Sequence, residues 1–142
     1  MVHSLTQIET YAMPTIQLLN PATLPTPTGY SQLATVSGGT LIVIAGQVAL
    51  DVNGAVVGQG DFAAQTTQVF RNLVAALGSA GATTTHLVKL TTFVTDLSDI
   101  GAFRRIRDQF LDKNHLPAST LVQVTRLFRP EFMIEIEAIA AV

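Results

Sequence analysis

The stretch FMIEIEAIAA, residues 132–141, decides the fold, because its apolar and charged residues alternate with the period of a β-strand. Ile134 and Ile136 fall on one side of this strand, and Glu135 and Glu137 fall on the other. Carboxylates on an apolar strand are costly unless they are paired or exposed to a cavity. The two glutamates therefore either meet solvent or an arginine across an interface, or they line a functional cavity, and the sequence leaves both interpretations open.

Working outward, two segments place apolar residues three or four positions apart, which predicts amphipathic helices over Phe62–Leu77 and Ile100–Leu111. Asp61 is a suitable N-cap for the first helix, and Gly38-Gly39 favours a hairpin between neighbouring strands. The order of strands, helix, strand, helix and strands predicts an α/β (α+β) domain of two layers, with two helices on one face of a mixed sheet. Further strands are expected over residues 15–19, 31–37, 40–45, 48–50, 86–94 and 120–128.

The composition favours a single domain that associates with copies of itself. The chain has 142 residues, which suits one domain over residues 1–142, with residues 1–13 as a loose leader. Charged residues make up only 13% of the chain, against about 25% in a typical soluble protein. Since the second face of the predicted sheet is also substantially apolar, we expect a buried subunit interface.

Charge and residue usage exclude several functional classes. The net charge of −2 argues against nucleic acid as the main partner. The only basic cluster, Arg104, Arg105 and Arg107, is expected to form a solvated face of the second helix. The absence of cysteine excludes disulfides and thiolate sites. The first 19 residues do not resemble a secretory signal, and no apolar run is long enough to span a membrane, so a cytoplasmic protein is expected. The three histidines lack metal-ligand spacing, so neither a metal nor another cofactor is expected; they are His3, His86 and His115.

Several short motifs occur in an order and spacing that together resemble the Rid/YjgF family, also called endoribonuclease L-PSP-like. The resemblance runs from about Tyr30 to Ala140 and is strongest near the C-terminus. The matching segments are Gly29–Gln32, Ala45–Gln47, Gln65, Asn72, Ala80-Gly81, Val88–Val94, Asp96-Leu97, Leu116–Thr120, Val124–Leu127 and Ile134–Ala140.

The resemblance implies a chorismate-mutase-like fold with a mixed six-stranded sheet, and a homotrimer with a cleft between each pair of subunits. It also implies hydrolysis of reactive enamines or imines to ketoacids and ammonia. In the family a Pro-Ala-Arg-Ser/Thr motif supplies an arginine that binds the substrate carboxylate, and Ser119 stands at that position here. Tyr30 and Glu135 match the family's tyrosine and glutamate and are the expected catalytic residues. Gly46 and Thr120 lie in matching motifs and are expected to contact substrate.

Ser119 changes what the resemblance implies about substrate. Losing a charge-assisted pair to a carboxylate costs about 2–5 kcal/mol of binding in a desolvated site, so the usual substrates should bind poorly. Alignment places Arg104 where the family often has an asparagine facing the cleft, although a register shift of one residue would place Phe103 there. Arg104 either restores the missing charge or is an ordinary exposed helix residue.

Three functions remain at this point. The favoured one is a hydrolase of deaminase type, with substrate preference altered by Ser119 and with Glu135 as general acid or base. The alternative is a non-catalytic trimer that binds or senses a small molecule, such as a carboxylate, in the same cleft. A ribonuclease or translation inhibitor is the weakest, because the chain has no basic stripe interleaved with aromatic residues.

Overall fold

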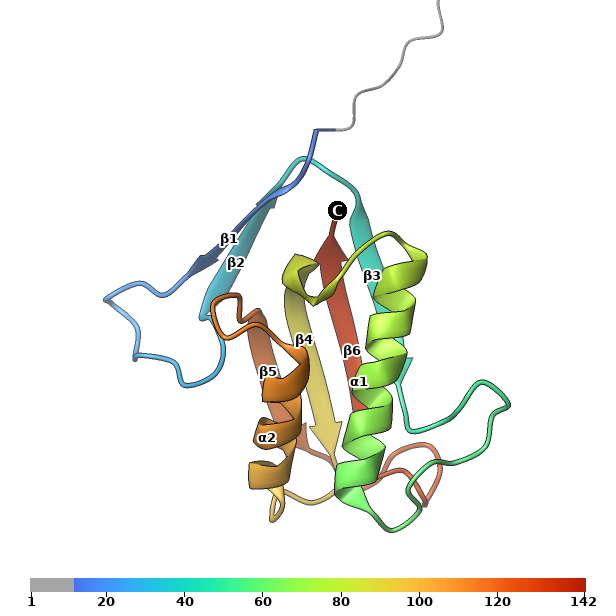
Figure 1. Ribbon diagram of the computed structural model, residues 1–142. Coiled ribbons are helices and arrows are strands. Elements are labelled where there is room, and N and C mark those ends of the chain that lie inside the picture. Colours follow the sequence, from blue (N-terminus) through green and yellow to red (C-terminus); the bar gives the residue numbers. More distant parts are fainter. Residues whose placement is uncertain (1–11) are drawn as a thin grey trace, which may run out of the picture.

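The structure is a computed structural model that describes residues 12–142, so the expected leader lies almost wholly outside the described part. Six strands and two α-helices alternate as the sequence predicted, and the α+β fold is confirmed (Figure 1). No helix within residues 12–142 is long and apolar enough to cross a membrane. The strands are β1 (Thr15–Leu19), β2 (Leu33–Ser37), β3 (Leu41–Gln47), β4 (Leu87–Val94), β5 (Ala118–Gln123) and β6 (Ile134–Ala141). The helices are α1 (Phe62–Ser79) and α2 (Ile100–Phe110), with a short 3-10 turn at Thr84–His86.

The main sheet is mixed and has four strands in the order β3-β6-β4-β5. The C-terminal strand with alternating apolar and charged residues, β6, lies inside this sheet and runs antiparallel to both of its neighbours. Strand β5 lies at the edge and runs parallel to β4. Strands β5 and β6, which carry Ser119, Thr120 and Glu135, are therefore fixed in register through β4.

The remaining two strands form a separate arm, which corrects the expectation of one six-stranded sheet. Strands β1 and β2 pair only with each other, and a single parallel bridge between Ser31 and Ala118 links the end of the arm to β5. Gly38 and Gly39 both adopt positive φ, as a tight turn requires. They join β2 to β3 across two sheets rather than forming the expected hairpin, because glycine patterns report a turn and not the partner of each strand.

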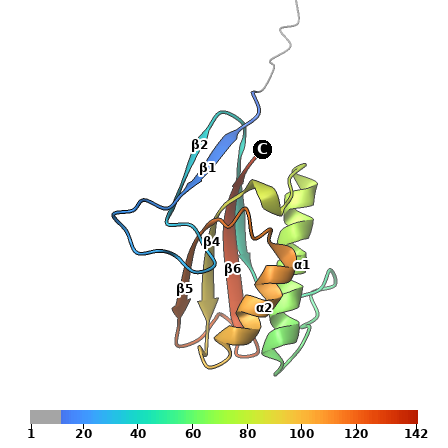
Figure 2. The same ribbon diagram turned by 60° about the vertical axis from the view of Figure 1, so that its left-hand side comes forward.

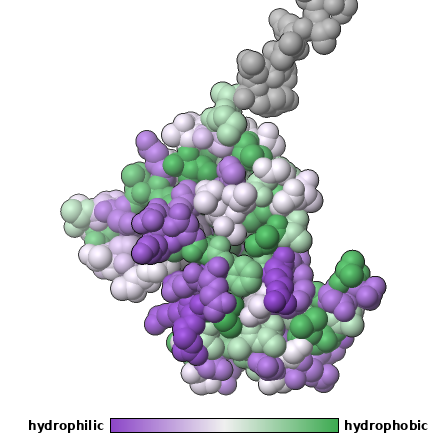
Figure 3. Space-filling model, viewed as in Figure 1, coloured by the Kyte–Doolittle hydropathy of each residue, from purple (hydrophilic) through white to green (hydrophobic). Residues whose placement is uncertain are grey.

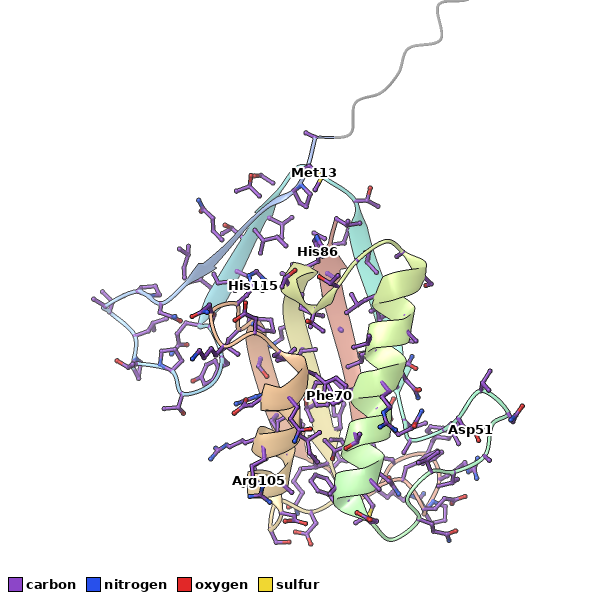
Figure 4. All side chains as sticks on the ribbon, in the orientation of Figure 1. Met13, Asp51, Phe70, His86, Arg105 and His115 are labelled. Atoms are coloured by element: carbon purple, nitrogen blue, oxygen red, sulfur yellow. The ribbon has the colours of Figure 1, made fainter. Side chains whose placement is uncertain are left out.

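Both helices cover the same face of the four-stranded sheet (Figures 1 and 2). Helix α1 begins where predicted, and Asp61 accepts a hydrogen bond from the Ala64 amide at 3.0 Å. Phe70 lies between the helices and stacks on Phe110 with 5.2 Å between ring centroids (Figure 4). The helix-facing residues of β6, including Ile134 and Ile136, are completely buried against this layer, so the predicted two-sided pattern of that strand is confirmed.

Other boundaries differ modestly from expectation. Strand β5 starts at Ala118 and ends at Gln123, so the expected strand over residues 120–128 is about half loop. His86 closes the 3-10 turn instead of starting β4. Leu50 does not continue β3 but makes one bridge with Val56 across the turn at Gly54. Val124, Thr125 and Phe128 have high strand propensity, which extended the predicted strand beyond the end of β5.

Candidate functional site

Two segments that are far apart in sequence are joined beside β5. The Ser31 hydroxyl donates to the Leu116 carbonyl at 2.6 Å, and the Ser31 amide donates to the Pro117 carbonyl at 3.1 Å. Ser31 is buried, so these bonds replace the water that its polar groups lose. They hold the loop that carries Tyr30 against the start of the strand that carries Ser119.

A pocket of about 510 Å³ opens at this junction, between the Tyr30 loop, β5 and α2. Its size falls in the range of small-molecule sites. Three of the sequence-predicted residues, Tyr30, Ser119 and Arg104, line it together. Its other polar lining residues are Thr28 and Arg107, and its apolar lining residues are Leu97, Ile100, Phe103 and Leu121. Among residues 12–142, no carboxylate or histidine lines this pocket.

The three arginines of α2 do not share one environment. Arg104 and Arg107 both line the pocket, as expected of residues three positions apart on a helix. Arg105 is exposed and bends back along α2 toward Gly101 (Figure 4). Hydrophilic residues gather over α2 and the loop that follows it (Figure 3). Phe103 points mainly into the core and is 4% exposed, so the structure places Arg104 at the pocket and leaves Phe103 as part of its floor.

Arg107 corrects the interpretation of the cluster as a solvated face. Its side chain is only 13% exposed, and its Nε and Nη2 atoms donate to Asp108 Oδ1 at 2.9 and 2.7 Å. Its guanidinium packs against Gly29, whose φ of 82° suits only glycine, and a Cβ there would lie 2.6 Å from Arg107 Nη2. Arg107 thus supports the loop that carries Tyr30. The three-residue spacing of Arg104 and Arg107 indicates that they share one side of the helix. The neighbouring charges nevertheless favoured the interpretation of a solvated face.

The other predicted residues lie on the opposite face of the sheet, away from the helices. Glu135 is the partner of Phe93 in the β4–β6 ladder, and Thr120 is the partner of Thr91 in the β4–β5 ladder. Lys89 Nζ donates to the Thr120 hydroxyl at 2.5 Å on this face. We call this surface the open face, because its apolar residues are left accessible; Leu41, Val43 and Val122 are 62%, 71% and 40% exposed.

Gly46 and Glu135 meet at an irregular point in the sheet. The register between β3 and β6 shifts between Ile44 and Gln47, which sets Gly46 beside the Glu135 carboxylate. A Cβ at Gly46 would overlap Glu135 Oε1. Burial raises the pKa of Glu135 above its ordinary value, and the nearby Glu137 carboxylate raises it further. A carboxyl group with a raised pKa is suited to proton transfer near neutral pH.

The structure therefore divides the six predicted site residues into two groups. Tyr30, Ser119 and Arg104 line the helix-side pocket, whereas Glu135, Gly46 and Thr120 occupy the open face. Adjacent residues of a strand point to opposite sides of the sheet, so Ser119 and Thr120 cannot serve one site within a single chain. A complete site that uses both groups needs a second copy of the chain.

Two polar residues in the matching motifs serve the fold instead. Gln65 is fully buried and binds the Gly58 and Glu131 carbonyls and the Met133 amide. Asn72 donates to the Val48 and Leu50 carbonyls at 3.1 and 2.9 Å. Both side chains satisfy loop backbone that would otherwise lack partners. 

The histidines of the described region also serve the backbone. His86 Nδ1 accepts a hydrogen bond from the Thr83 amide at 3.0 Å, and His115 Nε2 lies 3.3 Å from the Leu87 carbonyl. His3 lies outside the described residues. Within residues 12–142, no three histidine or acidic side chains gather as a metal site requires.

The family model for endoribonuclease L-PSP matches residues 21–142, which includes every element except β1. The chain belongs to this family, which is the Rid/YjgF/RutC family. A RutC family protein of Synechocystis is 35% identical over 127 residues, covering 89% of this chain and 96% of the relative. The 2-iminobutanoate/2-iminopropanoate deaminase of Salmonella typhimurium is 34% identical over 104 residues, covering 72% and 80%. The family therefore includes an imine deaminase.

Solved structures of this family share the fold. The Rid family protein YyfB from Yersinia pestis superposes with a TM-score of 0.81 at 35% identity, covering 89% of this chain and 98% of that one. RidA from the Antarctic bacterium Psychrobacter gives a TM-score of 0.67 at 31% identity, covering 89% and 99%.

Proposed function

We propose that this chain is a hydrolase that converts the imine or enamine form of an α-amino acid to a ketoacid and ammonia. The observation that carries the proposal is the helix-side pocket, where Arg104 lies beside Tyr30 and Ser119. Ser119 stands where the resemblance expects the carboxylate-binding arginine. Arg104 supplies a guanidinium to the same pocket from α2, which preserves the charge that a carboxylate needs.

The reaction adds water across a C=N bond. The water oxygen bonds to the carbon, the nitrogen takes up protons and leaves as ammonia when the C–N bond breaks, and a C=O bond remains. A group that accepts and returns a proton speeds both steps. Glu135 suits this role because its pKa is raised by burial and by Glu137. The Tyr30 hydroxyl orients water or the substrate at the pocket.

The complete site forms between two copies of the chain, one contributing the pocket and the other contributing Glu135, Gly46 and Thr120. Two observations support this arrangement. The two groups lie on opposite faces within one chain, and the open face exposes apolar residues such as Leu41 and Val43. A homotrimer would cover that face and form such clefts in a closed ring.

The direct test is ammonia release from imines generated in situ from L-alanine and L-leucine by an amino-acid oxidase. The chain should accelerate ketoacid and ammonia formation beyond the spontaneous rate. No acceleration with either imine, from protein shown to be folded and oligomeric, contradicts the proposal. 

Subunit sharing has its own test, in which Arg104→Ala and Glu135→Gln chains are co-expressed. Each variant alone should be inactive. Mixed oligomers should regain activity, because some clefts combine an intact pocket with an intact open face. A mixture that stays inactive, although mass spectrometry shows mixed oligomers, contradicts a shared site.

A second candidate, a non-catalytic small-molecule binder, is favoured by one observation. The described part of the chain places no carboxylate or histidine in the pocket, so the pocket can bind a ligand without supplying a group for proton transfer. A carboxylate that raises the melting temperature of the chain while remaining chemically unchanged, in the absence of any imine hydrolysis, identifies this function.

A further inference from the structure

The pocket beside α2 has two chemically different ends. Along α2, Ile100 and Arg107 are seven residues apart, which places them about 10 Å apart along the helix axis. Near Arg107 lie Gly29 and the Tyr30 loop, which is tied to the start of β5. Near Ile100 lies Leu97, whose amide donates a hydrogen bond to Gln123 Oε1, at the far end of β5, at 3.0 Å.

Strand β5 also runs from one end of the pocket to the other. Ser119, at its start, belongs to the end with Tyr30, and Leu121, two residues on and on the same face, belongs to the end with Leu97. The pocket therefore has a polar end lined by arginine, tyrosine and serine. Its other end is formed by Leu97, Ile100 and Leu121.

The polar end carries one uncompensated positive charge. Arg107 is engaged by Asp108 through two hydrogen bonds, which offsets its charge. Arg104 is exposed and makes no ion pair within residues 12–142. A single free guanidinium matches one carboxylate and offers nothing to a second anionic group, whose burial against Leu97 and Leu121 would be costly.

We infer that this pocket selects monocarboxylates with a branched or aromatic apolar side chain, of the kind derived from leucine or phenylalanine. The carboxylate binds Arg104 at the polar end, and the side chain lies against Leu97, Ile100 and Leu121. Small monocarboxylates leave the apolar end unfilled, and dicarboxylates place a charge in it. The inference rests on the proposed function for the reaction, but the binding preference stands on the pocket alone.

The test measures binding of stable ketoacids by isothermal titration calorimetry, so no turnover is needed. The ketoacid of leucine, 4-methyl-2-oxopentanoate, should bind at least about tenfold more tightly than pyruvate, because three more carbon atoms leave water. The dicarboxylate 2-oxoglutarate should bind no more tightly than pyruvate. Equal binding of the first two, or tightest binding of 2-oxoglutarate, overturns the inference.

A matched pair of variants tests whether the apolar end of the pocket causes the preference for the larger ketoacid. Leu97→Asn should reduce the preference for 4-methyl-2-oxopentanoate over pyruvate by about fivefold, since it makes the apolar end polar. Val74→Asn is the control, because Val74 on α1 is 43% exposed, as Leu97 is 42% exposed, and does not line the pocket. An unchanged preference in Leu97→Asn, or an equal loss in both variants, overturns the placement of the side chain.

The outcomes separate this inference from the proposed function. Preferential binding of 4-methyl-2-oxopentanoate without hydrolysis of any imine supports the inference and contradicts the hydrolase. Hydrolysis of alanine-derived and leucine-derived imines at equal rates, with no preference in ketoacid binding, supports the hydrolase and overturns the inference.

Discussion

Two glycines lie beneath charged side chains, one on each face of the sheet, and they differ in what they protect. Gly29, on the pocket side, has a φ of 82° and packs under Arg107. Gly46, on the open face, has no positive φ and leaves room for Glu135. The first glycine serves the shape of the backbone and the second serves the position of a carboxylate. The shape of the pocket therefore depends on the backbone conformation of the Gly29 loop. The open face depends instead on the position of the Glu135 carboxylate.

The largest effect is expected at the open face. Glu135→Gln should lower kcat by about 10²–10⁴-fold, the usual contribution of a positioned general acid or base. Binding of 4-methyl-2-oxopentanoate by the polar end should change little. Glu137→Gln, two residues along the same face, is the control and should retain most activity, because burial is the larger cause of the raised Glu135 pKa and remains. A Glu135→Gln enzyme with normal kcat would remove the open face from the reaction.

On the pocket side, Arg104→Ala should weaken 4-methyl-2-oxopentanoate binding by tens to thousands of fold, or about 2–5 kcal/mol, because a charged partner of the carboxylate is lost. Calorimetry measures the change. Arg105→Ala removes the adjacent charge outside the pocket and should bind normally. Equal effects of the two substitutions would mean that only the general positive field of α2 matters.

The two glycines provide a more direct contrast. Gly46→Ala should reduce kcat by about a hundredfold, since displacing a catalytic group by about 1 Å has that effect, while unfolding stability stays near normal. Gly29→Ala should instead lower the free energy of unfolding by about 1–3 kcal/mol, because alanine is strained at this φ. Denaturant unfolding curves and steady-state rates, measured for both variants, test this contrast. A reversed pattern would contradict the division of roles.

The smallest effect concerns pH. Because the folded pKa of Glu135 is raised, ionising it costs stability, and that cost appears as the pH rises through the folded pKa. Glu135→Gln should therefore stabilise the chain slightly at about pH 7 and leave it unchanged below about pH 4, where the carboxyl is protonated in both states. Thermal melts across this range measure the difference. A variant that is less stable at neutral pH would show that the Glu135 charge is favourably paired.

Much of the fold could be predicted because its signals are local. Apolar spacing located α1 and α2, Asp61 marked a helix start, and alternation set the two faces of β6. The sequence does not predict that β1 and β2 pair apart from the main sheet. Strand partners are chosen by long-range packing, and a Gly-Gly turn carries no information about them.

The candidate site shows the same limit, because local sequence does not reveal long-range contacts. Sequence motifs nominated Tyr30, Ser119, Arg104 and Glu135 together, although the structure separates the last from the others. The charged neighbours of Arg107 in the sequence predict a solvated side chain, but its environment is set by Gly29, nearly eighty residues away. Burial depends on such contacts and not on local composition.

The sequence by itself determined the family, the order of elements and the two-sided character of β6, since these follow from residue type and spacing. Only the tertiary structure decided which residues share a site. Pairing of β5 with β4, and of the Tyr30 loop with β5, fixes which face each side chain occupies. That register places Ser119 with Arg104 on the helix side of the sheet and Glu135 on the open face.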